Sequence, residues 1–301
     1  MNKKNFINKI IAKFLMFFAG FLITKNSRHK CKTLIKKLLL VPSNKELQLW
    51  QNIMNDKETL QYIIDNKCSL TRYGDGESGY MLYNNFNHFF QPYNKNLQEK
   101  LKHILLNSNN NCLIALPRFL NNKADSELTV NFQAQYWYGW EKYKKSNVPY
   151  GSAHCFFGKN FINGNLELMK RIWQNRNIVF ITGRGSTFVW IDELFNNSKS
   201  HKFIYTKAVD AFSEYDKIIE EVLHYNKDSL ILIALGVTAT ALAYDLSKLG
   251  YQAIDIGHIT NHYLTEIKGL KHVDTMRLEG KYIDGITDIN KIIEESINNE
   301  L

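Results

Sequence analysis

From residue 177 to residue 258, short apolar runs alternate with stretches of helical periodicity, and this alternation constrains the fold more than any other feature. The apolar runs cover 177–181, 202–205, 229–235 and 252–256. The helical stretches between them run through Phe195, over 213–224 and up to Leu249. Strands that alternate with helices of about 10–15 residues form βαβ units and a parallel sheet. We therefore expect an α/β fold: a single Rossmann-like domain with a mostly parallel sheet.

The chain from residue 43 to residue 145 adds further elements to this domain. A helix is expected over 43–66, opened by a capping box between Ser43 and Glu46. Apolar runs at 68–71 and 112–117 indicate buried strands. Helices are expected over 96–106 and 125–145, with an aromatic loop over 80–93. Because we find no internal repeat and no low-complexity linker, we place one domain at 45–301.

Residues 1–40 form a basic, partly apolar and amphipathic segment ahead of this domain. They contain ten Lys or Arg and no Asp or Glu, whereas the whole chain carries +9, so the body is nearly neutral. The apolar run Phe14–Ile23 has ten residues, well short of the roughly 20 that a spanning helix needs. We expect an interfacial anchor on an anionic membrane surface. A short spanning helix, a signal peptide and a buried helix remain alternatives.

Charge and cysteine usage bear on the class of protein. Without a basic stripe on its body, the chain is not expected to bind nucleic acid. The cysteines show no CxxC spacing, so they predict neither a zinc knuckle nor a disulfide framework. Scattered cysteines fit a reducing compartment. We expect a cytoplasmic protein, peripheral on the inner face of the plasma membrane.

The stretch from Arg72 to Glu77 places two carboxylates between glycines, directly after an expected strand. Mg²⁺ and Mn²⁺ bind one or two carboxylates together with substrate phosphate oxygens, so Asp75 and Glu77 are candidate ligands. The glycines Gly74 and Gly76 let the backbone turn sharply, and Arg72 could hold a phosphate beside the ion. The alternative is a simple turn in which Glu77 caps the next helix.

Two further turns join expected strands to expected helices through small residues, at 183–186 and 236–240. Backbone N–H groups at the start of a helix make such a turn a seat for phosphate. An ordinary tight turn with a Ser or Thr cap is the alternative for both. Neither turn is a complete GxGxxG or Walker loop, so an ATP or dinucleotide site is not indicated.

Polar residues also follow the last expected strand. Asp255 is a candidate base, and His258 is a candidate third metal ligand or base, with a structural histidine as the alternative. Ligands of parallel sheets bind outside the carboxyl ends of the strands. Every candidate named above follows a strand, so we expect these residues to converge.

Two motifs resemble the bacterial GT-D-type glycosyltransferases, a family first known as a domain of unknown function. They are Arg-Tyr-Gly-Asp-Gly-Glu at 72–77 and the longer run from Gly236 to His258, within a similarity that extends from about residue 45 to about residue 285. The resemblance implies a Rossmann-like domain that transfers a sugar from a nucleotide donor, typically a UDP-sugar. It also implies a divalent metal at an Asp-x-Glu motif, here Asp75 and Glu77.

We therefore expect a metal-dependent glycosyltransferase that acts on a glycan or lipid-linked glycan acceptor in bacterial surface polysaccharide or glycoprotein synthesis. The candidate catalytic residues are Asp75, Glu77, Asp255 and His258. The candidate ligands of Mn²⁺ or Mg²⁺ are Asp75, Glu77 and His258. The candidate donor-binding residues are Arg72, Gly74, Gly76, Gly183, Arg184, Ser186, Gly236, Thr238 and Thr240. The alternatives are a degenerate nucleotide-sugar-binding partner without catalysis and a Rossmann-like methyltransferase.

Overall fold

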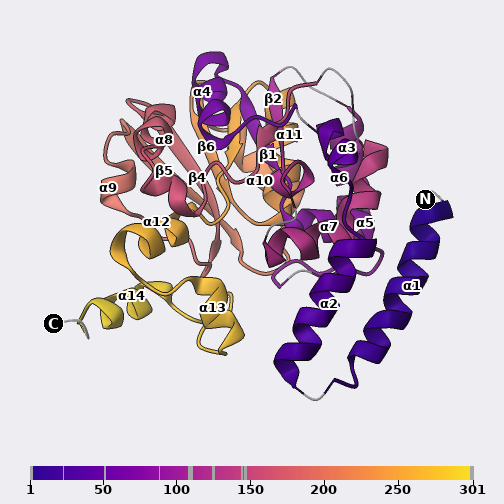
Figure 1. Cartoon of the computed structure of the whole chain (residues 1–301). Helices are drawn as coiled ribbons and strands as arrows, with labels where there is room; N and C mark the ends of the chain where they lie inside the picture. Colours follow the sequence, from indigo (N-terminus) through magenta and orange to yellow (C-terminus); the bar gives the residue numbers. More distant parts are fainter. Residues whose placement is uncertain are drawn as a thin grey trace. The chain divides into compact units, whose positions relative to one another are not determined.

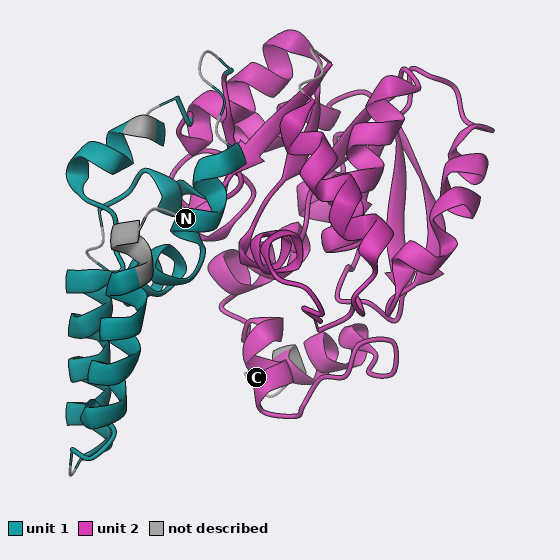
Figure 2. Ribbon diagram, turned by 90° about the vertical axis from the view of Figure 1, so that its right-hand side faces the viewer, with its two compact units in different colours: residues 1–53, 117–148 teal, residues 54–116, 149–301 magenta. Residues whose placement is uncertain are grey.

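The computed structural model describes residues 3–22, 24–50, 52–87, 89–107, 111–123, 126–143, 145 and 148–298. Ile23 and Asp125, which bound two predicted segments, and residues 299–301 of the predicted domain lie outside this set. The chain divides into two compact units, residues 1–53 with 117–148 and residues 54–116 with 149–301 (Figure 2). The division therefore does not follow the predicted boundary at residues 40–45, because 117–148 belongs with the N-terminal segment.

The second unit contains a seven-stranded sheet in the order β3-β2-β1-β7-β6-β4-β5 (Figure 1). Every strand pair is parallel, which confirms the predicted α/β class. The strands are β1 (Ser69–Arg72), β2 (Cys112–Leu116), β3 (Gly151–Ser152), β4 (Asn177–Arg184), β5 (Ser200–Lys207), β6 (Leu230–Ala234) and β7 (Gln252–Asp255). Residues of β1, β2, β4 and β6 are almost all buried, as expected of a parallel sheet covered on both faces.

Helices cover both faces of this sheet. The hydrophobic cluster on one face includes residues of α4 (Asp56–Asn66), α8 (Leu166–Trp173), α9 (Asp192–Phe195) and α12 (Ile259–Lys268). On the other face α11 (Val237–Lys248) packs on β1 and β7, with α6 (Lys95–Leu106) and α10 (Tyr215–Val222) beside it. The remaining helices of the unit are α5 (Asp75–Leu82), α13 (Val273–Leu278), α14 (Ile289–Asn298) and the 3₁₀ turns η4 (Gly158–Phe161) and η5 (Ala211–Glu214).

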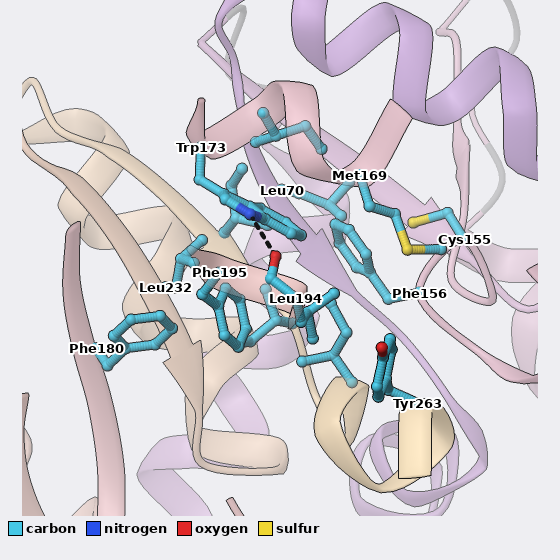
Figure 3. Packing of buried hydrophobic residues seen from close by; sticks show 14 of the residues in the cluster. Leu70, Cys155, Phe156, Met169, Trp173, Phe180, Leu194, Phe195, Leu232 and Tyr263 are labelled. Atoms are coloured by element: carbon cyan, nitrogen blue, oxygen red, sulfur yellow. Dashed lines mark hydrogen bonds between the residues drawn. The ribbon is translucent and has the colours of Figure 1, made fainter. Parts of the chain in front are cut away.

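The core on the α8 side is dense in aromatic rings (Figure 3). Trp173 is fully buried, and its indole Nε1–H donates to the Leu194 carbonyl oxygen at 3.0 Å, so its one polar atom has a partner. Phe195 packs 5.2 Å from the Trp173 ring and 5.0 Å from Phe180. This packing holds α8, α9 and β4 together.

Two predicted helices are wrong in extent. The helix expected over 43–66 is broken into α3 (Asn44–Leu47), η1 (Gln48–Trp50) and α4, because Asn55 and Glu58 form a second capping box that starts a new helix. The capping box at Ser43 is confirmed. The helix expected from residue 186 is absent before Asp192, since β4 continues to Arg184 and pairs with Lys207 of β5.

The first unit contains a helical hairpin, α1 (Lys3–Ala19) and α2 (Lys25–Leu39), with α7 (Glu127–Trp140) and the 3₁₀ turns η2 (Arg118–Leu120) and η3 (Glu141–Tyr143) (Figure 1). Helix α2 packs against both α1 and α7, and the Lys36 ammonium group donates to Asn131 Oδ1 at 2.7 Å. Residues 25–39 therefore form part of a folded unit. Within the described residues, no helix combines the length and apolar character needed to cross a bilayer.

Candidate active site

A cavity of about 260 Å³ lies at the carboxyl ends of β1, β6 and β7, all within the second unit. The predicted site residues that line it are Arg72, Gly74, Asp75, Gly76, Glu77, Gly236, Asp255 and His258. They come from three separate strand ends, so the structure brings together the residues that the parallel topology was expected to bring together. The cavity therefore defines the candidate active site.

Arg72 and Asp255 form a buried ion pair in the wall of this cavity. Arg72 Nη2 donates to Asp255 Oδ1 at 2.9 Å, Nε donates to the Asp255 carbonyl oxygen at 2.7 Å, and Nη1 donates to the Ala153 carbonyl oxygen at 2.9 Å. The Phe157 ring lies 4.7 Å from the guanidinium carbon. Burial raises the pKa of the Asp255 carboxyl, and Arg72 opposes that shift. The guanidinium thus joins three segments and fixes the carboxylate.

Asp75 and Glu77 occupy the first turn of α5, not an open loop. The Glu77 carboxylate accepts the Gly74 N–H at 2.8 Å, so the capping role considered as an alternative is confirmed. Asp75 Oδ1 accepts the Gly76 N–H at 2.9 Å. Burial, together with the nearby Asp255 charge, raises the pKa of Glu77 to about 7. Both carboxylates still line the cavity.

The start of α11 also reaches the cavity, through Gly236. Gly236 has φ +52° and ψ −136°, and a Cβ there would lie 1.9 Å from the Phe90 ring. The hydroxyls of Thr238 and Thr240 point elsewhere: Thr238 donates to Gln91 Oε1 at 3.1 Å and Thr240 to the Arg72 carbonyl oxygen at 2.9 Å. Only the backbone of this turn faces the cavity, whereas the two threonines hold neighbouring segments.

The turn at 183–186 does not form the predicted helix start. Gly183 lies within β4, where a Cβ would be 2.4 Å from the Ala208 backbone, so only glycine permits this close approach of the Ala208 backbone. Gly183 and Ser186 line a separate, adjoining cavity of about 30 Å³, enough for about one water molecule. Arg184 lines neither of the two cavities, and its guanidinium lies 5.1 Å from the Tyr205 ring centroid.

Several cavity residues were not singled out from the sequence. His262 and Asp274 line the larger cavity, and His272 lies beside them, its ring 4.7 Å from that of His262. The spacing of His258 and His262 is one helical turn, and the His262 N–H does donate to the His258 carbonyl at 3.0 Å. That spacing was a usable signal, whereas nothing in the sequence links either residue to His272.

The histidines are neutral near pH 7. Burial lowers the pKa of His258 to about 4 and that of His262 to about 3, and it also lowers the pKa of His272. Neutral imidazole has a lone pair for a metal or a proton. Among the described residues, the one group of three potential ligands within 4.8 Å of one another is His258, His272 and Asp274. The structure therefore groups His258 with these two residues and not with Asp75 and Glu77.

The charges in the cavity favour a cation. Four carboxylates line it, from Asp75, Glu77, Asp255 and Asp274. Asp255 pairs with Arg72 and Asp274 with Arg277, whereas Asp75 and Glu77 form no ion pair among the described residues. A diphosphate would be repelled by this surface unless a cation accompanied it. The two carboxylates of Asp75 and Glu77 fit the preference of Mg²⁺ and Mn²⁺ for carboxylate, water and phosphate ligands. The residues present thus fit a divalent ion.

Sequence comparison identifies relatives for most of the chain. Residues 70–285 match the family model described as the glycosyltransferase GT-D fold. Glycosyltransferase GlyD of Streptococcus pneumoniae serotype 4 is 30% identical over 217 residues, 68% of this chain and 26% of that protein. The probable glycosyl transferase Gly of Streptococcus gordonii is 26% identical over 239 residues, 73% of this chain and 34% of that protein. The chain thus spans about a quarter to a third of these relatives' length.

Solved structures share the same architecture. One, described as the highly conserved domain of unknown function 1792 with a distinct glycosyltransferase fold, has a TM-score of 0.66 and 29% identity, covering 75% of this chain and 86% of that one. Another, described as a new glycosyltransferase from Streptococcus sanguinis, has a TM-score of 0.63 and 28% identity, covering 73% of this chain and 86% of that one.

Proposed function

The chain belongs to the glycosyltransferase GT-D fold family, and from this premise we propose that it transfers a sugar from a nucleotide diphosphate sugar, with UDP as the expected nucleotide, to a glycan or lipid-linked glycan acceptor. The observation that supports the proposal most directly is the cavity at the carboxyl ends of β1, β6 and β7, which is lined by four carboxylates, two of them without an ion-pair partner among the described residues. Such a surface suits an anionic diphosphate only in the company of a divalent cation.

Asp75 and Glu77 are the proposed ligands of that ion, Mn²⁺ or Mg²⁺. When bound, the ion would neutralise the charge that develops on the departing diphosphate. Asp75 is the more exposed of the two. Glu77 must give up its proton to bind a metal, because its pKa of about 7 leaves it partly protonated at neutral pH.

The remaining roles follow from what each side chain contacts. Asp255 is the proposed base for the acceptor hydroxyl, and Arg72 holds its carboxylate in place through the 2.9 Å ion pair. The backbone N–H groups at the start of α11, next to Gly236, are the proposed donors to a phosphate of the sugar nucleotide. Because each of its three guanidinium nitrogens already donates to a protein oxygen, we assign Arg72 the role of contributing positive charge to the cavity while positioning Asp255.

The first test is isothermal titration of the full chain with UDP, with and without Mn²⁺. We expect binding that requires the metal and is lost in Asp75→Asn, whereas Asp216→Asn, which removes an exposed aspartate on α10, retains it. Sugar transfer should be lost in the same Asp75 variant while its circular dichroism is unchanged. Absence of heat with and without Mn²⁺ would overturn the UDP-sugar proposal and favour a different donor or a binding partner without catalysis.

We also propose that the helical hairpin of the first unit binds an anionic membrane surface. Phenylalanines at the end of α1 are exposed, including Phe14 (63%), Phe17 (64%) and Phe21 just beyond it (72%), while Ala12 and Ala19 face inward. The surrounding segment 1–40 contains ten Lys or Arg and no acidic residue. Apolar side chains flanked by cations suit the interface of an anionic bilayer, where a lipid-linked acceptor would be carried.

A further inference from the structure

His258, His272 and Asp274 form a second group of metal-ligand side chains in the cavity wall. One ligand atom of each lies within 4.8 Å of the others. His258 precedes α12, whereas His272 and Asp274 lie at the start of α13, so the group joins two separate helices. His258 and Asp274 line the 260 Å³ cavity. An ion bound by all three would therefore have its open coordination positions toward the cavity.

The two ring nitrogens of His272 differ in their surroundings. Nε2 is buried and has no hydrogen-bond partner among the described residues. The other nitrogen, Nδ1, lies 3.2 Å from the Asp274 backbone nitrogen and 3.5 Å from Asp274 Oδ2. In the tautomer that leaves the Nε2 lone pair free for a ligand, Nδ1 carries the ring proton and Oδ2 is its acceptor. A buried nitrogen without a partner is costly, and an ion coordinated at Nε2 would remove that cost. The ring therefore offers a buried ligand atom that a purely structural histidine would not be expected to leave unsatisfied.

The surrounding charges permit a cation despite the nearby Arg277. Its guanidinium is neutralised by two hydrogen bonds to Asp284, at 2.9 Å from Nε and 2.6 Å from Nη2. Arg277 also donates from Nη1 to Asp274 Oδ1, which orients the carboxylate and leaves Oδ2 on the His272 side. Counting Arg72 and Asp255, three carboxylates face two guanidiniums around the group, so the local balance is negative.

We propose that His258, His272 and Asp274 bind a divalent transition-metal ion of the Zn²⁺ class, separate from the hard ion proposed at Asp75 and Glu77. Imidazole nitrogen suits Zn²⁺ and Co²⁺, whereas Mg²⁺ and Ca²⁺ prefer an all-oxygen shell. Two histidines and one carboxylate with an open position form a known ligand set for zinc. The ion would tie α13 to the start of α12 and present an electrophile to the cavity. The site stands whether or not the cavity binds a sugar nucleotide.

The test is Co²⁺ titration of the full, tag-free chain after chelator treatment, followed by visible absorption. We expect one ion per chain, with the intense ligand-field bands of a four- or five-coordinate site. His272→Gln and Asp274→Asn should each weaken binding by at least about 100-fold, since loss of even an outer partner of a ligand costs roughly 10–100-fold. His224→Gln, which removes an exposed histidine near the end of α10, is the matched control and should bind normally.

Asp75→Asn separates this site from the proposed hard-ion site, because it should abolish Mn²⁺-dependent UDP binding and leave the cobalt bands unchanged. Zn²⁺ should also raise the Tm of the chain and of the His224 control, and leave the Tm of the His272 and Asp274 variants unchanged. This second readout detects variants that fold but no longer bind. The weak spectrum of hydrated cobalt in the unsubstituted chain, or full bands in both ligand variants, would overturn the proposal.

Discussion

Arg72 illustrates how one residue of a predicted site can have a role different from the one its type suggests. An arginine beside two carboxylates predicted a phosphate ligand, yet each of its three guanidinium nitrogens donates to an oxygen of Asp255 or Ala153. The side chains of Arg72 and Asp255 are only 7% and 4% exposed. Removing one member of such a pair leaves the other charge buried and uncompensated, which is far costlier than losing a surface ion pair.

Arg72→Met should therefore lower the free energy of unfolding by about 3–5 kcal/mol, because Asp255 is left without its counter-charge. Urea titration followed by circular dichroism measures the change. Arg171→Met, which removes an exposed arginine of α8, is the matched control and should change stability by less than about 0.5 kcal/mol. The double variant Arg72→Met, Asp255→Leu should recover part of the loss. Equal stability of the two single arginine variants would contradict the proposed role of the ion pair.

Glu77 predicts a pH dependence of stability in metal-free buffer. Burial raises its folded-state pKa to about 7 from 4.5, so folding favours the protonated form. The stabilising contribution of protonated Glu77 to the free energy of unfolding is fully present below pH 4.5 and is lost as pH rises through about 7. The Glu77→Gln variant should lack this pH-dependent loss of stability. Its free energy of unfolding relative to that of the unsubstituted chain should therefore increase as pH rises between those two values. Urea midpoints measured across the range test this expectation.

Glu220→Gln, at an exposed position of α10, is the control for the Glu77 experiment and should reproduce the pH profile of the unsubstituted chain. The lowered pKa values of His258 and His262 act in the opposite direction. Because folding favours the neutral rings, the protein loses stability as pH falls from 6.5 toward about 4 for His258 and about 3 for His262. The urea midpoints of the variants are therefore compared with one another at each pH, and the change in one variant's midpoint with pH is not interpreted by itself. A Glu77→Gln profile parallel to that of the control would contradict the raised pKa of Glu77.

At the scale of elements, the junction of β6 and α11 depends on Gly236. Its φ of +52° with ψ −136° is a backbone conformation open almost only to glycine, and a Cβ there would meet the Phe90 ring at 1.9 Å. Phe90 lines both cavities, and its ring lies 6.3 Å from that of His258. The junction therefore couples the start of a helix to an aromatic side chain of the segment between α5 and α6.

Gly236→Ala should lower the free energy of unfolding by roughly 1–3 kcal/mol more than Gly250→Ala does. Both substitutions strain the backbone, but only at Gly236 does the added Cβ also overpack against a neighbouring side chain. Gly250 is the matched control, since it also has a positive φ, +86°, but a Cβ there would meet no atom within 4 Å. Urea unfolding of both variants measures the difference. In a Phe90→Ala background the excess cost of Gly236→Ala should largely disappear. If Gly236→Ala still lowers the free energy of unfolding by the larger amount in the Phe90→Ala background, backbone strain and not contact with the Phe90 ring would account for the loss.

The elements that sequence predicted best are those with a local cause. Alternating apolar runs located β4 to β7, and the polar residues after β1, β6 and β7 meet because parallel strands end at one edge. The prediction failed where tertiary pairing decided the outcome: the ladder with β5 carries β4 through Gly183 to Arg184, and no helix begins there. The His258, His272 and Asp274 group was invisible for the same reason, since the packing of α13 brings it together.

At the scale of the whole molecule, positive and negative charge are concentrated in different parts of the chain. The net charge of +9 is more than accounted for by residues 1–40, with ten basic and no acidic residues, while the proposed active site is rich in carboxylates. Helix α2 packs on α7 and shares a unit with it. Deleting residues 1–40 would uncover α7, so substitution on α1 is the cleaner way to test the proposed membrane contact.

The triple variant Phe14→Ser, Phe17→Ser, Phe21→Ser should weaken binding to vesicles containing phosphatidylglycerol by at least about tenfold, because each exposed ring would lose apolar area buried in the bilayer. The three rings contact one another or Phe18, and none belongs to the buried cluster of the hairpin, so the fold should persist. Co-sedimentation measures binding.

The control for the membrane experiment is the double variant Leu278→Ser, Ile286→Ser, which removes side chains that are 80% and 79% exposed in the second unit. It lowers exposed apolar area in the second unit and leaves the hairpin unchanged, so it should bind the vesicles as the unsubstituted chain does. Purely zwitterionic vesicles should bind the unsubstituted chain more weakly, because the cations of residues 1–40 then lack anionic headgroups. Equal binding of the triple and double variants would place the membrane contact outside α1, and equal binding to both kinds of vesicle would remove the electrostatic part of the proposal.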